Sequence, residues 1–349
     1  MKFRTQLNPI PLQKKINVSN KIVLMGSCFS ENIGQKLLEN KFETLINPFG
    51  VIFNPLSVIQ LLEWIMLEKN QNKKGEVLEK NLEKFYIQHD EVWYNYHLHS
   101  KIASQDKEEL KQIIKEKAKQ TFEFLEKADT IILTFGTAFM YELIEKNDEN
   151  TKIPISNCHK QNKNLFNKKL IDLETAKTKF EDFINKLNSF GKKEKQIIIT
   201  VSPVRHLKEG LVENSVSKSI LRVLAHFICQ NKTEKFENCV YFPSYELVLD
   251  DLRDYRFYET DLLHPNNQAI EYIWQKFSEG YFDDKTQLFL KKWQKIASSL
   301  AHKPFFPKRK NHQDFIQKLI TDLEKIENEF KIDVKKEIEF LKNNNTKLV

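Results

Sequence analysis

Glycine is scarce in this chain. Average usage of about 7% would give roughly 24 glycines at this length, whereas the sequence has 8. Glycine-rich phosphate loops of the Rossmann and Walker types do not occur, so nucleotide sites of these two kinds are excluded. Gly26, Gly34, Gly50 and Gly136 all fall in the first 140 residues. Three of these four glycines end strand-like or extended segments, where a chain turns or admits a ligand.

Cysteine pairs and long apolar runs are also missing. Cys28, Cys158, Cys229 and Cys239 form no CxxC motif, which argues against a zinc knuckle and against a disulfide framework. No apolar run approaches the roughly 18 residues that a bilayer span needs, and the first residues lack the apolar core of a signal peptide. We therefore expect a cytoplasmic protein with reduced thiols and no membrane contact.

Arginine is the third scarcity. Six of the 55 basic residues are arginine, and the lysines are scattered among 48 acidic residues although the net charge is +7. Dispersed lysine is typical of a solvated surface, so the composition does not indicate a nucleic-acid partner.

What the chain does contain is a series of short apolar segments with helical patterns between them. The apolar segments are residues 21–25, 42–46, 130–135, 196–201 and 239–243. Strands that are apolar on both faces are typical of a parallel sheet. The helical patterns cover residues 30–40, 55–67, 107–127, 173–187, 215–230 and 266–277. The alternation predicts a three-layer α/β/α fold of flavodoxin-like type, with a five-stranded, mainly parallel sheet.

Two segments depart from this alternation. Period-two patterning around residues 89–91 predicts an inserted β-hairpin at about residues 84–100. In the tail, apolar residues step by three and four at Ile316, Leu319, Leu323, Ile326 and Phe330. This amphipathic helix is expected to pack on the main domain, and a homodimer through the C-terminal helices is the alternative. We therefore divide the chain into a main domain at 1–282 and a helical extension at 283–349.

Ligands of such folds bind beyond the carboxyl ends of the strands, so the residues that follow each strand are candidates for chemistry. The first strand is followed by Gly26-Ser27-Cys28-Phe29. A hydroxyl at a strand-to-helix turn projects from the sheet edge, where nearby amides can stabilise an oxyanion. Ser27 is therefore a candidate nucleophile, and Cys28 is a rival in the same turn.

A second candidate motif, Asp261-Leu262-Leu263-His264-Pro265, follows the last strand. Residues three apart lie on one side of a helical turn, so Asp261 can accept from one ring nitrogen of His264 and leave the other free as a base. This is the base-and-orienter half of a catalytic triad.

The two motifs together resemble the GSCFA family, a branch of the SGNH (GDSL-like) hydrolase superfamily. Other stretches are similar to that family as well: residues 47–50 (NPFG), 54–55 (NP), 133–137 (LTFGT), 157–160 (NCHK), 202–206 (SPVRH), 214–218 (NSVSK) and 254–258 (DYRFY). The resemblance covers roughly residues 5–282 and leaves out the tail.

The resemblance implies a serine hydrolase or acyl-transfer site with Ser27 as nucleophile, His264 as general base and Asp261 as its orienter. SGNH enzymes build the oxyanion hole from the amide of the nucleophile, a glycine amide after the second strand and an asparagine side chain after the third. Gly50 matches the glycine. The block that supplies the asparagine reads Gly136-Thr137-Ala138-Phe139 here, so Thr137, a backbone amide or Asn157 has to substitute.

Arg205 and His206 follow the fourth strand, and Arg253 and Arg256 precede the aspartate–histidine motif. In a chain that otherwise uses lysine, clustered arginine suggests bidentate pairing with a carboxylate. The partner is either an internal carboxylate, such as Asp250, Asp251, Asp254 or Glu259, or an anionic or sugar-linked substrate.

The functional hypothesis is an esterase or acyl transferase that forms an acyl-enzyme with a small acyl ester, on a carbohydrate by analogy with the superfamily. A non-catalytic ligand-binding module on a decayed SGNH fold is the alternative, and hydrolysis through Cys28 is a third possibility. No cofactor is expected. No metal is expected either, because His97 and His99 lack a third ligand at useful spacing.

Overall fold

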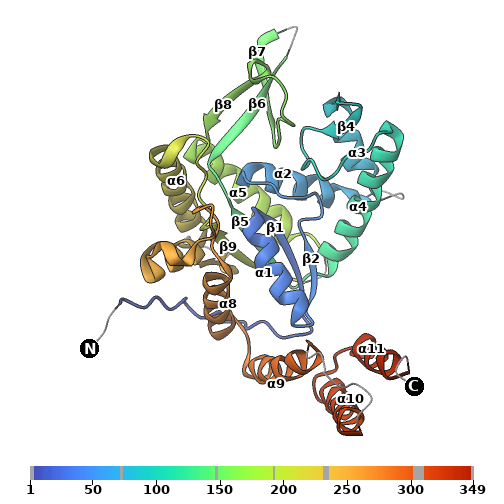
Figure 1. The fold of residues 1–349 in the computed structure, drawn as a ribbon. Helices are drawn as coiled ribbons and strands as arrows, with labels where there is room; N and C mark the ends of the chain where they lie inside the picture. The colour runs from blue at the N-terminus through green and yellow to red at the C-terminus, as the bar shows by residue number, and fades with distance from the viewer. Residues whose placement is uncertain are drawn as a thin grey trace.

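The central element is a five-stranded sheet with the order β10-β9-β5-β1-β2. The computed structural model describes residues 4–70, 74–145, 148–191, 193–230, 236–301 and 310–346. The strands are β1 (Lys21–Gly26), β2 (Glu43–Ile46), β5 (Thr130–Phe135), β9 (Gln196–Val201) and β10 (Cys239–Phe242). They coincide with the five apolar segments, and every pairing is parallel. The predicted α/β class is confirmed, and the sheet is parallel throughout (Figure 1).

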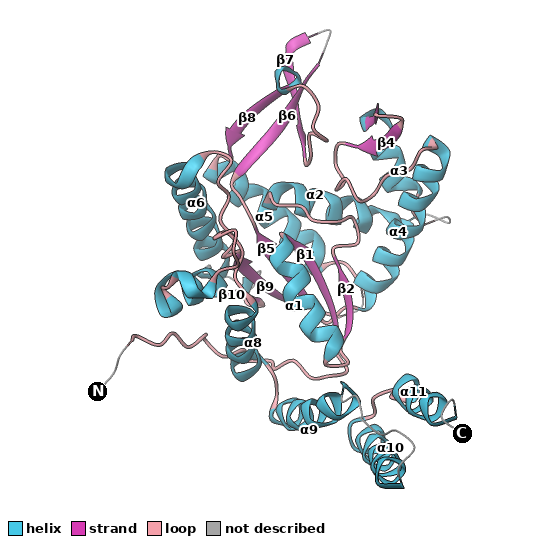
Figure 2. Ribbon diagram, in the orientation of Figure 1, coloured by secondary structure: helices cyan, strands magenta, loops and turns pink. Residues whose placement is uncertain are grey.

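Each central strand contributes side chains to two hydrophobic cores, which explains why the strands are apolar at successive positions. On β1, Val23 and Met25 enter one core, while Ile22 and Leu24 enter the other. The first core is covered by α2 (Pro55–Met66), α4 (Lys107–Lys127), α5 (Leu173–Asn188) and α6 (Gly210–Gln230). The second is covered by α1 (Cys28–Glu39) and α8 (Asn267–Tyr281). The sheet thus lies between two helical layers (Figure 2).

The helix boundaries follow from capping residues in the sequence. Asn54 accepts from the amides of residues 56 and 57 at the start of α2, which has proline in its first turn. Asp106 and Asn266 cap α4 and α8 in the same way, as is usual for Asp and Asn at this position. The exception is α6, which begins at Gly210 rather than at the expected Ser215. Its first turn carries exposed Leu211 and Val212, so no apolar periodicity marks that turn.

Two smaller sheets project from the main fold. The expected hairpin consists of β3 (Tyr86–His89) and β4 (Val92–Asn95), and it follows α3 (Glu76–Leu82). An antiparallel sheet of β7 (Asp148–Ile155), β6 (Phe139–Glu145) and β8 (Phe166–Leu170) lies between β5 and α5 in the chain. This second sheet was not predicted from the sequence, and it projects beyond the carboxyl ends of the central strands (Figure 1).

The C-terminal part of the chain is helical and has its own core. It contains α9 (Asp284–Ala301), α10 (Lys310–Phe330) and α11 (Lys335–Thr346). The short α7 (Ser244–Glu246) and a π-helical turn (Leu247–Leu252) come before α8, and Leu247 and Val248 belong to the second core of the sheet. The apolar stripe on α10 is buried against α9 and α11. Trp293 on α9 donates from Nε1 to the carbonyl of Glu39 at 2.7 Å, which ties these helices to α1. In the described part of the chain, no helix is long and apolar enough to cross a bilayer.

The strand order also defines where a ligand would bind. Across the sheet the strands lie in the order β2, β1, β5, β9, β10. The chain passes from β1 to β2 on one side and from β5 to β9 on the other, so the strand order reverses between β1 and β5. Ligands of doubly wound folds bind beyond the carboxyl ends of the strands at such a switch point. Gly26 is paired with Thr134, and Thr134 with Thr200, so these ends are level with one another.

Candidate active site

The turn between β1 and α1 lies at the switch point and is held from two sides. Gly26 donates its amide to Oδ1 of Asn47 at 2.9 Å, and its carbonyl accepts from the amide of Ile52 at 2.9 Å. On the other side, the amide of Ser27 donates to the carbonyl of Thr134 at 3.0 Å. The turn therefore has a fixed position relative to β5 and to the segment after β2.

Ser27, the predicted nucleophile, is fully buried. It is the N-cap of α1, and its Oγ accepts from the amide of Phe29 at 3.3 Å. Its own amide, expected in the oxyanion hole, is the group bonded to Thr134. Both polar groups of Ser27 thus have structural partners.

Cys28 is the first residue of α1 and is only partly buried. Burial raises the pKa of its thiol, and the charge of Glu31 raises it further. The amides of Cys28 and Phe29 and the charge of Lys218 act in the opposite direction. The first amides of a helix have no partner within the helix and favour negative charge. Cys28 thus has the exposure that Ser27 lacks, and both side chains lie at the amides that begin α1.

Asp261 and His264 form the predicted pair. Nδ1 of His264 lies 2.6 Å from Oδ2 of Asp261, and both side chains are about half exposed. Oδ1 of Asp261 accepts from the amides of His264 and Leu263. These amide bonds, together with the bond from the imidazole, lower the pKa of Asp261 to about 2. The carboxylate is therefore ionised at any pH near neutrality and orients the ring so that Nε2 is free.

The segment after β9 places Arg205 and His206 beside this pair. The amide of Arg205 donates to the carbonyl of Leu263 at 3.2 Å. Burial lowers the pKa of His206 to about 4, and the charges of Lys218, His264 and Lys168 add to that effect. Nε2 of His206 is buried and has no hydrogen-bond partner among the described residues. The 261–264 motif and the end of β9 therefore lie at one edge of the sheet.

The arginines between residues 205 and 256 have different partners. Arg222 pairs with Glu246, and Arg256 lies 3.3 Å from Asp254. The guanidinium of Arg205 instead lies over the rings of Tyr258, at 4.3 Å, and Tyr255, at 5.0 Å. Within the described residues, Arg205 forms no ion pair with a carboxylate.

Gly50 also lies at this edge. Its φ is +76°, and a Cβ there would lie 2.3 Å from Cβ of His99. The amide of Gly50 donates to the carbonyl of Asn47 at 2.8 Å, so this expected oxyanion donor has a partner in the turn. Glycine is needed because His99 is seated directly against it, which also brings His99 to the rim of the site.

Gly136 and Thr137 hold the loop after β5 in place. Both amides donate to the carbonyl of Phe53, at 2.8 and 3.1 Å. The hydroxyl of Thr137 lies 3.0 Å from Oγ of Ser217 and accepts from the amide of Phe139. The groups that Thr137 was expected to offer to an oxyanion therefore bond to the protein itself.

Asn157, the other predicted donor, is bound to the segment that follows the hairpin. Its Oδ1 accepts from the amide of His159 at 3.0 Å, and its Nδ2 lies 3.4 Å from Oγ of Ser100. His159 in turn bonds to Ser100 and to the carbonyl of Asn95. Hydrogen bonds thus connect Asn157 to residues 95–100 and not to the turn at Ser27.

The model of the GSCFA family matches residues 21–277. The chain belongs to the GSCFA family. A second model, the GSCFA domain protein, C-terminal domain, matches residues 293–346, so the tail that the sequence resemblance left out is similar to known sequences as well. A search of curated proteins gives no match.

Lys218 is a residue at the GSCFA site whose role the sequence analysis missed. Its Nζ donates to the carbonyls of Gly136 and Ser202, both at 2.7 Å, and the side chain is fully buried. The signal was present, because Lys218 ends the family-like stretch at residues 214–218, but one lysine in a lysine-rich chain does not stand out. Among the described residues, no cluster of three or more side chains suited to a metal ion is found.

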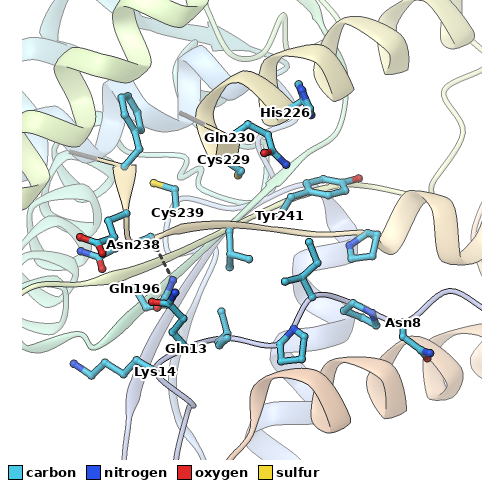
Figure 3. Close-up of a pocket in the computed structure, with 18 of the residues that line it drawn as sticks. Asn8, Gln13, Lys14, Gln196, His226, Cys229, Gln230, Asn238, Cys239 and Tyr241 are labelled. Atoms are coloured by element: carbon cyan, nitrogen blue, oxygen red, sulfur yellow. Dashed lines mark hydrogen bonds between the residues drawn. The ribbon is translucent and has the colours of Figure 1, made fainter. Parts of the chain in front are cut away.

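A groove of about 1000 Å³ runs along the outer edge of β10, between α6 and residues 7–14 (Figure 3). Its lining includes Cys229, Cys239 and Tyr241 together with Asn8 and Gln13. None of the predicted site residues lines it. The groove is therefore separate from the site at the carboxyl ends of β1, β5 and β9.

Proposed function

We propose that this GSCFA protein hydrolyses a small acyl ester, or transfers its acyl group to another hydroxyl, through a covalent intermediate on Cys28. The observation that carries the proposal is the Asp261–His264 pair, whose side chains meet at 2.6 Å at the edge of the sheet where β1 ends in the Gly26–Cys28 turn. The resemblance of both motifs to SGNH hydrolases supports ester chemistry at this edge of the sheet, although that resemblance implies Ser27 as the nucleophile.

The geometry favours Cys28 over Ser27 as the nucleophile. Ser27 has no accessible surface, and its amide and hydroxyl are both engaged in holding the turn. Cys28 is partly exposed and begins α1, whose first amides lower the pKa of its thiol against the larger effect of burial, which raises it. A thiolate is also the stronger nucleophile, which would offset an incomplete oxyanion hole.

The reaction would proceed in two steps. The thiol of Cys28 gives its proton to Nε2 of His264 and attacks the ester carbonyl, forming a carbon–sulfur bond and an oxyanion. The oxyanion collapses, the carbon–oxygen bond breaks, and the imidazolium protonates the leaving alkoxide. Water, or a second hydroxyl, then loses its proton to His264 and attacks the thioester, which releases Cys28 and an acid or a new ester.

Substrate selection is assigned to the segment after β9. Arg205 has tyrosine rings around its guanidinium and no carboxylate partner within the described residues. Its charge is therefore available to an anionic or sugar-linked ester, as the arginine clustering suggested.

The test is turnover of a short-chain aryl acetate panel by wild type and single variants, together with intact mass after iodoacetamide and after a fluorophosphonate. Cys28→Ala is expected to lose at least about 1,000-fold in rate because the nucleophile is removed. His264→Ala is expected to lose about 100- to 10,000-fold. Ser27→Ala should remain active and lose about 0.5–2 kcal/mol of stability, because its hydroxyl caps α1.

The control is Cys158→Ala, which removes a thiol outside the site and should leave turnover unchanged. Loss of activity and of fluorophosphonate labelling in Ser27→Ala alone would establish the serine mechanism instead. If wild type neither turns over an ester nor forms an acyl adduct, the ligand-binding alternative is favoured.

A further inference from the structure

Leu262 has a backbone conformation that leucine rarely adopts. Its φ is +59°, in the left-handed region that glycine and asparagine occupy most easily. Among the described residues, the other non-glycine residues with positive φ are all polar or charged, so Leu262 is the single apolar one. A bulky side chain in this region strains the folded protein, and strain of this kind persists mainly at functional sites.

The turn that contains Leu262 is closed by backbone groups. The amide of Leu262 donates to the carbonyl of Glu259 at 2.9 Å, and the amide of Glu259 donates to the carbonyl of His264 at 2.7 Å. Oδ1 of Asp261 accepts from the amides of Leu263 and His264. The side chain of Leu262 is 50% exposed and belongs to none of the hydrophobic cores formed by the described residues. The turn therefore has no need of a leucine, and glycine or asparagine would fit its backbone better.

Two other large apolar side chains are exposed on the segments that flank this turn, those of Tyr255 and Leu207. Arg205 connects both segments to the turn. Its amide donates to the carbonyl of Leu263 at 3.2 Å, and its guanidinium lies 5.0 Å from the ring of Tyr255. Leu207 follows Arg205 by two residues. Single exposed apolar residues are ordinary, whereas several in one place indicate a surface that binds something apolar.

The position of Leu262 suits the part of a substrate that extends from the reacting carbonyl. His264 is the base of the proposed reaction, so the ester carbonyl has to lie near its Nε2. Leu262 is two residues before His264 in the same turn. Residues two apart lie within about 7 Å of each other, a length that a hexanoyl chain covers and an acetyl group does not.

We propose that Leu262 is a specificity-determining residue that contacts an apolar acyl chain of medium length, such as hexanoyl, and that its strained backbone is retained for this contact. The chain would lie over Leu262 and extend toward Tyr255 and Leu207. The inference rests on the proposed function, because it names the class of acyl group that this reaction would transfer.

The test is the ratio of kcat/KM for an aryl hexanoate to kcat/KM for the matching aryl acetate, measured together with the thermal midpoint. Leu262→Asn relieves the backbone strain, so we expect a midpoint about 1–3 °C higher. The same variant removes the apolar contact, so the ratio should fall at least about 10-fold. Leu262→Met retains an apolar side chain of similar size and should keep the ratio within about threefold.

An unchanged ratio in Leu262→Asn would overturn the inference. A lower thermal midpoint in that variant would overturn it as well, because the leucine would then serve the turn itself.

Leu288→Asn is the matched control. Leu288 is 47% exposed, close to the value for Leu262, but it lies within α9. Its replacement should lower the thermal midpoint, because asparagine is a poorer helix former than leucine, and should leave the ratio unchanged. An equal fall of the ratio in both asparagine variants would show that the loss of any exposed leucine has this effect, and the assignment to Leu262 would be wrong.

A binding measurement separates this inference from the proposed function, because it needs no turnover. In isothermal titration calorimetry, wild type should bind sodium hexanoate at least about 10-fold more tightly than sodium acetate, and Leu262→Asn should lose this preference. The two anions carry the same charge, so the difference reports the chain. If Cys28→Ala retains ester turnover while hexanoate binding depends on Leu262, the proposed function fails and the contact stands. Equal hexanoate binding by wild type and Leu262→Asn overturns the contact, whatever Cys28→Ala shows.

Discussion

At Gly26 the backbone φ is +139°, and a Cβ would lie 2.1 Å from the carbonyl oxygen of Thr134. That carbonyl is also the acceptor for the amide of Ser27. The close approach of β5 to the turn therefore depends on the missing side chain, in addition to the conformational freedom that glycine has at positive φ.

We predict that Gly26→Ala destabilises the protein by more than about 2 kcal/mol, because β5 has to move or the turn has to change conformation. Gly210→Ala is the control: its φ is +85°, and nothing lies within 4 Å of the added Cβ. That variant meets only the conformational cost of about 1 kcal/mol. Urea denaturation measures both, and equal losses would show that the contact with Thr134 is unimportant.

At the residue scale, the sequence predicted contacts between residues that are close in the chain and missed contacts between separate segments. Asp261 and His264 are three residues apart and make the predicted contact, but through a non-helical turn in which Leu262 has a φ of +59°, not through the helical turn that the spacing suggested. The engagement of Ser27 with Thr134 depends on which strand lies beside β1, and the burial of Lys218 depends on three separate segments meeting. The sequence placed Thr137 after the correct strand, but it could not show that Ser217 holds Thr137 or that Ser100 holds Asn157.

At the scale of elements, His97 connects the hairpin segment to α2. Its ring packs edge-on against Trp64 at 5.1 Å and Phe85 at 4.3 Å, and it is almost fully buried. Burial, with a smaller effect from the charge of Lys84, lowers its pKa to about 3. His97 therefore stays neutral in the folded protein under conditions that protonate it in the unfolded chain.

This difference predicts an acid-dependent loss of stability. Between the folded pKa of about 3 and the ordinary value of 6.5, the unfolded chain binds more protons, so the free energy of unfolding falls as pH falls below about 6.5. From pH 7 to pH 5 the contribution of His97 is about 2 kcal/mol. His97→Leu should reduce the loss by about that amount in urea denaturation. His226→Gln, at an exposed position, should not.

The central strands were predictable because they are apolar on both faces, whereas the β6–β7–β8 sheet was not. This sheet packs on the hairpin segment through a small cluster that includes Tyr141, Leu143, Ile155 and Phe166. Its strands also carry charged and polar side chains such as Glu142, Asn167 and Lys168. On β6, Tyr141 and Leu143 alternate with Glu142, but so short an alternation does not reveal that β6 pairs with both neighbours.

At the scale of the whole molecule, the C-terminal helices pack on one another and contact the main fold. The stripe on α10 suggested either packing on the main domain or a homodimer, and its residues are buried within the chain. The helices meet the main fold at the end of α1, where Lys41 pairs with Glu337 and its ammonium lies 5.1 Å from the ring of Trp293. The apolar face that motivated the homodimer thus already has a partner.

We predict that Trp293→Ala releases α9, α10 and α11 from α1 while the sheet stays folded. The ring is buried, stacks on Phe289 and donates to the carbonyl of Glu39, and its removal should cost about 3–5 kcal/mol. Hydrogen exchange measured by mass spectrometry should therefore rise in α10 and α11 and stay slow in β5, because local stability differs between cooperative units. Phe340→Ala, at an exposed site on α11, should leave exchange unchanged. If exchange rises equally in β5, the helices and the sheet unfold as one unit, and the tail is an integral part of the fold that holds the site.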